Sequence, residues 1–371
     1  MLTLRIVRLR ETLAIVALVA LLAPNAAAQR KGKEIPRPST PPMQLPTRAW
    51  KDLVARDRVL ARVGSEDEDG PALFGYIGSV EIGKDSTIYV TESSTRQIRA
   101  FRPDGRFIAS VGRSGRGPGE FVELGALAYD GDSTLLVTQG YIGVSEFVAR
   151  DGAFTFRRIH NQARKIRGAC SLYGQVYLSV GVEQGIVEAL DADRQPFRSF
   201  GSTFSRESTK AARAMSVDFG APMTCDVEQD RIYLSAFGRI RSYRADGALA
   251  WETTLPDFRH AWFIEQPAVL YPDDFIDGIH ALSDRHVIVQ VRRVDYTKAR
   301  PTPRSGPNAR VSPPVVARRT FLIDASSGKL LALVSGAPTL RAVRYGLAVE
   351  AIDDPYPMFR VHALTPATSP E

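Results

Sequence analysis

The sequence predicts an all-β protein, a six-bladed β-propeller with four-stranded antiparallel blades. A unit of short strands and turns recurs six times between Val59 and Leu364, at intervals of about 40–55 residues. Its strands carry β-branched or aromatic residues at alternate positions and end at turn residues. The sixth unit lacks a fourth strand, and an unmatched strand precedes the first unit. Four strands per repeat at this period are typical of a propeller blade.

The clearest repeat, residues 80–112, shows the order of elements within one blade. After an inner strand come a turn at 83–86, a second strand at 87–91, a third strand at 97–101, a Pro-Asp-Gly turn and a fourth strand at 107–111. Elsewhere the second strands lie at 134–137, 176–179, 231–234, 286–289 and 346–349, the third strands at 144–147, 186–190, 240–243, 320–323 and 358–361, and fourth strands begin at Phe154, Phe197, Leu249 and Leu330. Asp and Gly recur in the turns because Asp hydrogen-bonds the turn backbone and Gly accepts positive φ.

The two ends of the repeat region predict how the ring closes. The chain ends soon after the third strand of the last repeat, whereas residues 58–64 resemble the fourth strand and glycine at 107–112. We therefore expect the N-terminal strand to complete the last blade, which removes the free sheet edges of an open array. An open β-solenoid or a pair of sandwiches would explain neither observation.

The chain divides into a signal peptide at residues 1–28, a Pro-rich spacer at 29–49 and the propeller at 50–366. The first segment combines a basic start, an apolar run from Leu13 to Leu22 and the small residues Ala26 to Ala28, as secretory signals do. This run is too short to span a bilayer comfortably, and no other segment qualifies. No cysteine lies near the cleavage site, so we expect no lipid anchor. We expect an exported monomer, periplasmic or at the cell surface.

One segment carries most of the positive charge. The full chain has a net charge of +7, whereas residues 292–319 alone contain eight Lys or Arg and one Asp. The segment lies between the second and third strands predicted for blade five and is rich in proline. We therefore expect an extended basic insertion that contacts an anionic partner. Aromatic residues are sparse in it, which argues against nucleic acid as the partner.

Cys170 and Cys225 are the only two cysteines, and both align with one position of the inner strand in consecutive blades. An even number in an exported protein favours a disulfide. Equivalent positions of neighbouring blades, however, point the same way around the ring, which can hold the Cα atoms beyond the ~7 Å limit for bridging. A disulfide and two buried thiols therefore both remain open. His280 aligns with the same position, so a Cys-Cys-His zinc or copper site is a third interpretation.

A Gly-rich segment, GRSGRGPGEF at 112–121, follows the fourth strand of the first blade. With DSTIYVT at 85–91 and QIRAF at 97–101, it resembles the repeat of secreted bacterial six-bladed propellers of the NHL type. The resemblance extends over residues 50–364 and is strongest in the first blade. It implies the fold and, loosely, a binding role. It transfers no catalytic residue, because the glycines and Phe121 serve turns and packing in that motif.

Propeller enzymes need convergent residues that this sequence does not assemble. Calcium lactonases of this shape use several carboxylates and asparagines on inner strands, and only Glu81 and Asp226 are candidates here. A zinc lyase needs about three converging histidines, whereas only His160 and His260 map to one face. We therefore predict no cofactor. A metal-dependent hydrolase or lyase of the lactonase-like type remains the alternative function.

Long links gather at one end of the predicted blades, because second-to-third and fourth-to-first connections emerge on the same side of antiparallel blades. We expect this side to bind a protein or an anionic envelope glycan. The candidate binding residues are Arg113, Arg116, Glu120, His160, His260, Trp262, Arg292, Arg293, Arg300, Arg304 and Arg310. The sequence thus predicts a rigid interaction platform.

Overall fold

The structure is a computed structural model that describes residues 43–64, 70–131, 133–139, 142–150, 153–161, 166–180, 184–202, 222–236, 238–259, 261–264, 269–283, 285–295, 298, 300–301, 311–353 and 355–366. The predicted signal peptide and most of the predicted spacer lie outside these residues. The chain forms two compact units, one of Met1–Arg37 with Ala261–Tyr271 and one of Pro38–His260 with Pro272–Glu371. Strands β19 (Ala261–Ile264) and β20 (Val269–Pro272) form a two-stranded sheet of their own.

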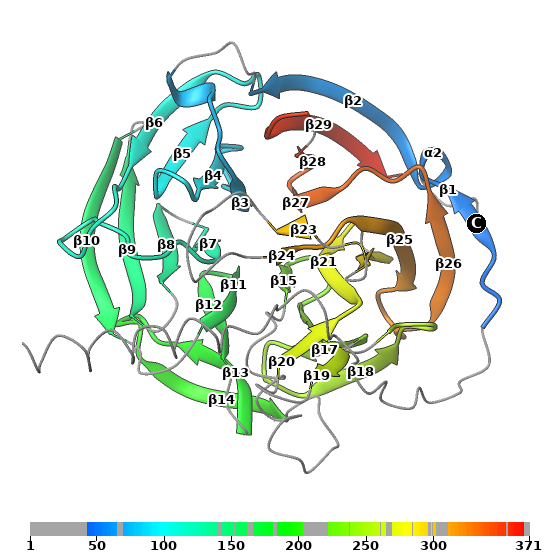
Figure 1. The fold of residues 1–371 in the computed structure, drawn as a ribbon. Coiled ribbons are helices and arrows are strands. Elements are labelled where there is room, and N and C mark those ends of the chain that lie inside the picture. Colours follow the sequence, from blue (N-terminus) through cyan, green and yellow to red (C-terminus); the bar gives the residue numbers. More distant parts are fainter. Residues whose placement is uncertain are drawn as a thin grey trace, which may run out of the picture. The chain divides into compact units, whose positions relative to one another are not determined.

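The larger unit is a six-bladed β-propeller of four-stranded antiparallel blades, which confirms the predicted fold (Figure 1). From the centre outward, blade one contains β3 (Ile77–Ile82), β4 (Ile88–Glu92), β5 (Gln97–Phe101) and β6 (Phe107–Val111). Blade two contains β7 (Leu127–Tyr129), β8 (Thr134–Gln139), β9 (Gly143–Arg150) and β10 (Ala153–Asn161). Blade three contains β11 (Ile166–Leu172), β12 (Gln175–Val180), β13 (Gln184–Leu190) and β14 (Pro196–Ser202).

The remaining three blades follow the same order. Blade four contains β15 (Met223–Asp226), β16 (Arg231–Ala236), β17 (Arg239–Arg244) and β18 (Leu249–Thr254). Blade five contains β21 (Asp274–Ala281), β22 (His286–Val294), β25 (Val315–Asp324), β26 (Leu330–Ser335) and, as a fifth strand, β1 (Thr47–Ala49). Blade six contains β27 (Leu340–Arg344), β28 (Leu347–Ile352), β29 (Met358–Pro366) and β2 (Val54–Val63).

The N-terminal strand closes the ring, as the sequence predicts. β2 pairs antiparallel with β29, with Asp57 opposite Leu364 and Val63 opposite Phe359. The inner strands contact one another in the order β3, β7, β11, β15, β21 and β27, and β27 contacts β3 again. The last blade therefore takes its outer strand from one end of the chain and its three inner strands from the other.

The end of the predicted spacer belongs to the fold. β1 pairs in parallel with β26, with Thr47 opposite Leu333, and the one-turn helix α2 (Trp50–Leu53) leads from β1 into β2. Three residues are too few to show an alternation of apolar and polar side chains, so the sequence gives no signal for β1. A further helical element is the turn η1 (Gly70–Ala72), and no helix among the described residues is long and apolar enough to cross a membrane.

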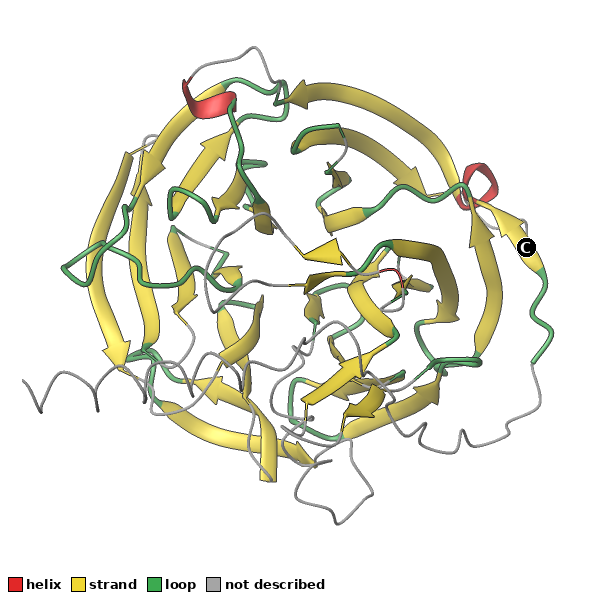
Figure 2. Ribbon diagram, viewed as in Figure 1, coloured by secondary structure: helices red, strands yellow, loops and turns green. Residues whose placement is uncertain are grey.

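The core lies between the blades. Among the described residues six apolar clusters form, one at each interface of neighbouring blades. In β4, Ile88 and Val90 pack toward blade six, whereas Tyr89 packs toward blade two. Alternate side chains of one strand thus face opposite neighbours, so the second strands are buried on both sides. Strands make up most of the ring, and loops and turns connect their ends (Figure 2).

The basic insertion of blade five is shorter than the sequence predicts. β22 extends to Val294 and β25 begins at Val315, so four arginines assigned to the insertion lie within strands. Between them, β23 (Arg300–Pro301) pairs with β24 (Val311–Ser312). The strands can carry these arginines because each of them pairs with Asp274 or Asp277 of strand β21.

Candidate functional site

The loop face is defined here as the side of the propeller where second-to-third-strand and fourth-to-first-strand connections emerge. In blade five it contains the start of β21 at Asp274, the end of β22 at Val294 and the start of β25 at Val315. In blade one it contains the Gly-rich segment 112–121. Two of the sequence-predicted binding regions are therefore on this face, in blades that are not neighbours.

The centre of the blade-five site is Asp274, whose side chain is fully buried. Its two carboxylate oxygens accept hydrogen bonds from Arg293 Nε at 2.7 Å and Nη2 at 2.8 Å. Arg319 Nη2 and the backbone N–H of Arg259 each donate to Oδ2 at 2.8 Å. Asp274 lies opposite Arg293 in the sheet register, which sets up the bidentate pair. The carboxylate therefore fixes two guanidinium groups at the loop-face end of the blade.

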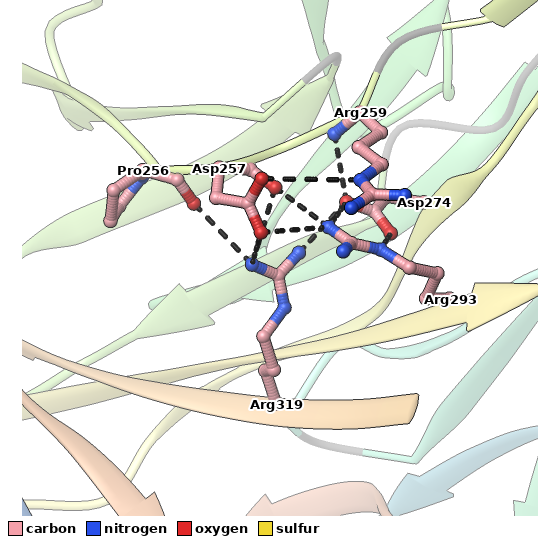
Figure 3. A network of polar contacts seen from close by, with 6 residues as sticks. All are labelled: Pro256, Asp257, Arg259, Asp274, Arg293 and Arg319. Atoms are coloured by element: carbon pink, nitrogen blue, oxygen red, sulfur yellow. Dashed lines mark hydrogen bonds and ion pairs between the residues drawn. The ribbon is translucent and has the colours of Figure 1, made fainter. Parts of the chain in front are cut away.

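A second carboxylate, that of Asp257, approaches the same guanidiniums from the link between blades four and five (Figure 3). Its Oδ2 lies 3.2 Å from Arg293 Nη2 and 3.4 Å from Arg319 Nη1, and its Oδ1 lies 4.0 Å from Arg259 Nε. The Asp257 carbonyl accepts hydrogen bonds from Arg293 Nη2 at 2.7 Å and Arg319 Nη1 at 3.2 Å. The Pro256 carbonyl accepts another from Arg319 Nη1 at 3.5 Å. Unlike Asp274, Asp257 is exposed, with 57% of its side chain accessible to solvent.

The two arginines differ in their electrostatic surroundings. Hydrogen bonding to Asp274 raises the pKa of Arg293 above its ordinary value. Burial lowers the pKa of Arg319, because desolvation of its charge outweighs the attraction of Asp274 and Asp257. Both guanidiniums stay charged at neutral pH. An incompletely compensated Arg319 favours additional negative charge at this position.

The other side of the same blade carries a second arginine pair. Asp277 accepts hydrogen bonds from Arg292 Nη1 at 2.6 Å and Arg318 Nη1 at 3.1 Å. Arg292 and Arg318 are direct cross-strand neighbours, and the Arg292 guanidinium carbon lies 4.9 Å from the centre of the Phe275 ring. Their side chains are 34% and 47% exposed, whereas Asp277 is nearly buried. The blade thus presents two fixed guanidiniums to solvent.

The Gly-rich segment of blade one satisfies its own polar groups. Glu120 accepts hydrogen bonds from Arg113 Nε at 2.7 Å and from the Gly117 N–H at 2.8 Å. Phe121 is fully buried, and its N–H donates to the Arg113 carbonyl at 2.8 Å. The Gly117 N–H, followed by Arg113, lowers the pKa of Glu120 below its ordinary value. Glu120 therefore closes the loop, while Arg113 and Arg116 remain exposed on it.

His160, predicted as a binding residue, is buried in blade two. Its Nε2 lies 2.8 Å from Glu146, which also accepts hydrogen bonds from Arg157 and Arg158 at 3.0 Å each. Burial acts to raise the pKa of Glu146, but hydrogen bonds from His160 and Arg158 bring it below its ordinary value. His160 therefore stabilises a buried carboxylate, and the structure gives it no exposed surface for a ligand.

The remaining binding candidates lie outside the described residues or in the short strands β19 and β23. His260, Arg304 and Arg310 lie outside the described residues. Trp262 lies in β19 and Arg300 in β23, and only their strand positions are described.

The candidate metal ligands are engaged separately. Glu81 accepts a hydrogen bond from Arg344 at 2.7 Å, and Asp226 caps its own turn through the N–H groups of Glu228 and Gln229. Burial raises the pKa of both carboxyl groups. His280 Nε2 lies 3.2 Å from the Leu340 carbonyl, and burial lowers its pKa to about 4. The described residues contain no group of three potential metal ligands.

Cys170 and Cys225 form a disulfide, with their Cα atoms 5.5 Å apart. The sequence alignment placed them at the same strand position, and the sheet register differs from it by one residue. Cys170 pairs with Tyr177, which packs toward blade four, and the counterpart of Tyr177 in blade four is Tyr233, which packs toward blade five. Cys225 pairs with Ile232, the residue before Tyr233, so its side chain points the opposite way, toward blade three. Cys170 therefore faces blade four, Cys225 faces blade three, and both join the apolar cluster between them. Bonded sulfurs are not thiolates, which removes the Cys-Cys-His interpretation.

The carboxylates of the blade-five site were not found from the sequence. A signal exists: Asp273-Asp274 and Asp277 begin one strand, while Arg292-Arg293 and Arg318-Arg319 lie at the adjoining ends of the next two. Two arginine doublets opposite spaced aspartates indicate ion pairs on both sides of a sheet. The doublets were instead assigned to a solvated insertion.

Comparisons with known proteins agree with this fold. A family model described as a 6-bladed beta-propeller (DUF5128) matches residues 69–137, which include blade one and the first two strands of blade two. No curated protein sequence matches the chain. A protein described as exported, from Bacteroides fragilis, has a TM-score of 0.54 at 10% identity, covering 86% of this chain and 99% of that one. A duf4221 family member from Bacteroides vulgatus has a TM-score of 0.49 at 9% identity, covering 85% and 100%. At these identities a likeness concerns the fold alone, and the support for it comes from the family model and from the Bacteroides fragilis structure, whose TM-score is 0.54.

Proposed function

We propose that the protein is an exported binding platform that recognises an anionic ligand through the loop face of blade five. The arginine pair Arg292 and Arg318 carries this proposal. Two guanidiniums on adjacent strands are held by one nearly buried carboxylate and remain partly exposed. Arg presents planar donors that suit carboxylate, phosphate or sulfate groups, and fixing them on strands reduces the entropy lost on binding.

The charge of the surrounding networks supports this assignment. On the two sides of blade five, five arginines pair with three aspartates, so the cations outnumber the carboxylates that hold them. The insertion next to them adds further basic residues in the sequence. A local excess of one sign attracts oppositely charged partners and accelerates their association. The proposed partner is a protein or an anionic envelope glycan, met by a monomer in the periplasm or at the cell surface.

The alternative, a metal-dependent hydrolase or lyase, finds no supporting observation in the described residues. Glu81, Asp226 and His280 each have a separate partner within the fold and do not converge. The blade-five arginines supply binding groups and no evident nucleophile. Binding is therefore the activity that the arrangement supports best.

The test compares ligand binding by two double variants. A fluorescent poly-aspartate and a fluorescent polygalacturonate serve as anionic probes at several salt concentrations. Arg292→Gln with Arg318→Gln should lower the affinity for the bound probe at least tenfold, because glutamine keeps a hydrogen bond to Asp277 but removes both charges. Arg102→Gln with Arg106→Gln, two exposed arginines in a turn on the opposite face, is the matched control. Equal losses in the two double variants, or no binding of either probe by the natural protein, would contradict the proposal.

A further inference from the structure

We infer that Arg293 and Arg319 form a recognition site for an aspartate in an acidic peptide, and that the protein's own Asp257 occupies this site until such a peptide displaces it. This inference rests on the proposed function, because it names a ligand class for the loop face of blade five. Three features of the network in Figure 3 support it: a permanent anchor, an exchangeable occupant and contacts specific for a peptide.

The anchor is Asp274. Its contacts to Arg293 and Arg319 measure 2.7–2.8 Å, and its side chain is fully buried. Removing one partner of a buried ion pair is strongly destabilising, since the remaining charge is left uncompensated. The two guanidiniums therefore keep their positions whether or not Asp257 is in place. A site that stays formed without its occupant is preorganised for a replacement.

The occupant is Asp257. Its carboxylate lies 3.2–4.0 Å from three guanidiniums and is 57% exposed. Exposed ion pairs contribute little to stability, because solvent screens the two charges. Asp257 also has a positive φ of 48°, a conformation that Asp tolerates better than most residues but that is still uncommon. Little free energy therefore opposes the departure of this carboxylate, and a peptide that takes its place must also replace the Asp257 and Pro256 carbonyls at Arg293 and Arg319.

The contacts indicate a peptide as the external ligand. Besides the carboxylate, Arg293 and Arg319 bind the main-chain carbonyl of Asp257, and Arg319 also binds the carbonyl of Pro256. A side-chain carboxylate beside consecutive main-chain carbonyls is the pattern of an aspartate in a polypeptide turn. A uronic acid polymer offers the carboxylate without the adjoining peptide carbonyls. A turn with Pro-Asp in a partner protein would reproduce all the contacts.

An internal competitor lowers the apparent affinity by the fraction of time that it fills the site. Neutralising Asp257 should therefore tighten binding of an acidic peptide by about three- to tenfold. Asp257→Asn keeps the side-chain shape and tolerates positive φ, whereas Asp257→Gly also removes the side chain that fills the site. An essential structural role for Asp257 would instead weaken binding in both variants.

The test measures binding of a fluorescein-labelled peptide with two Pro-Asp units, by anisotropy, to the natural protein and its Asp257→Asn and Asp257→Gly variants. Asp246→Asn is the matched control, since Asp246 is an exposed aspartate 3.7 Å from Arg244 in a turn on the opposite face. We expect tighter peptide binding in both Asp257 variants and none of this gain in Asp246→Asn. Labelled polygalacturonate, measured in parallel, should gain less than the peptide.

The outcomes separate this inference from the proposed function. If acidic probes bind and depend on Arg292 and Arg318, but Asp257 variants bind the peptide no more tightly, the inference fails and the binding platform stands. A gain for polygalacturonate without a gain for the peptide also overturns the peptide assignment. If the natural protein and both Asp257 variants bind none of the probes, both proposals fail.

Discussion

The Gly-rich segment of blade one and the strand ends of blade five carry arginines on the same face, but the two regions hold these arginines in different ways. In blade one, Arg113 contacts Glu120, which also accepts the Gly117 N–H and closes the loop. In blade five, each aspartate of β21 holds two arginines, so positive charge exceeds the local carboxylates. Both regions are basic in the sequence, and their difference lies in how the fold uses the charge.

The two regions differ in how firmly an arginine side chain is held. A guanidinium paired with one carboxylate in an exposed loop can leave that geometry freely, because exposed pairs contribute little. Guanidiniums that share a buried carboxylate are fixed and still attract a further anion. We therefore expect the carboxylates of blade five to fix charged groups, and the glycines of blade one to fix the backbone of a loop.

The largest expected effect is on Asp274. Asp274→Asn should reduce the free energy of unfolding by about 3–5 kcal/mol, since Arg293 and Arg319 would lose their buried counter-charge. Asp257→Asn removes the other carboxylate that contacts the same two arginines, and it should reduce the free energy of unfolding by only about 0–1 kcal/mol. Urea unfolding at neutral pH measures both. Similar losses in the two variants would mean that the buried Asp274 and the exposed Asp257 stabilise the protein equally, which would contradict their assignment as anchor and occupant.

The stability of blade one should depend on the backbone conformation of its Gly-rich loop and not on the charges in that loop. Gly112 has a φ of +92°, and a Cβ there would overlap the ring of the buried Phe121. Gly112→Ala should therefore cost about 2–4 kcal/mol, from backbone strain together with displacement of Phe121. Gly131 has nearly the same φ, +91°, with open space around it, so Gly131→Ala should cost about 1–2 kcal/mol. Equal costs measured by urea unfolding would show that the Phe121 contact is unimportant.

Blade five should also be sensitive to acid through His280. Burial lowers the pKa of this histidine to about 4 in the folded protein, below its ordinary value of 6.5. The unfolded chain therefore binds a proton that the folded protein does not, and stability falls as pH decreases from about 6.5 towards 4, by about 3 kcal/mol in all. Urea midpoints measured between pH 8 and pH 4 should show this loss, and His280→Gln should remove it.

His362 in blade six contributes to stability with the opposite pH dependence, so it affects the same measurement. Burial acts to lower the pKa of His362 in the folded protein, but the hydrogen bonds that its ring donates to Glu350 and Asp57 raise it above its ordinary value. Its contribution is complete below pH 6.5 and disappears as pH rises through the folded pKa. His362→Gln should therefore flatten the alkaline side of the profile only. If His280→Gln loses as much stability at acid pH as the natural protein does, the loss comes from groups other than the His280 imidazole.

The fold could be predicted from the sequence because its determinants are local and repeated. Six copies of the same alternation and turn pattern reveal the blades, and the unmatched strand at 58–64 predicts the ring closure seen between β2 and β29. Local patterns do not fix register across blades, however. A one-residue misalignment of blade four with blade three sufficed to misplace the side-chain directions of Cys170 and Cys225.

The site could be predicted only in part, for a related physical reason. The basic stretch at 292–319 points to the blade and the face that carry the arginine networks, but its proline and arginine content predicts a solvated loop. Whether an arginine lies in solvent or in a strand depends on carboxylates elsewhere in the chain. Asp274 and Asp277 are 15–19 residues from their first partners and more than 40 from the second, so a pattern within one segment cannot show them.

The smallest expected effect concerns the exposed charges of the Gly-rich segment. Arg113→Gln with Arg116→Gln should change the free energy of unfolding by less than about 1 kcal/mol, because the Arg113 side chain is 80% exposed. Binding of poly-aspartate should change less than twofold at moderate salt, since both side chains lie in a loop whose carboxylate is already engaged. The equivalent double substitution at Arg292 and Arg318 removes the same formal charge from the same face, so net charge cancels in the comparison. A comparable loss of binding in the two double variants would mean that the ligand responds to the overall potential of the loop face and not to the fixed guanidiniums of blade five.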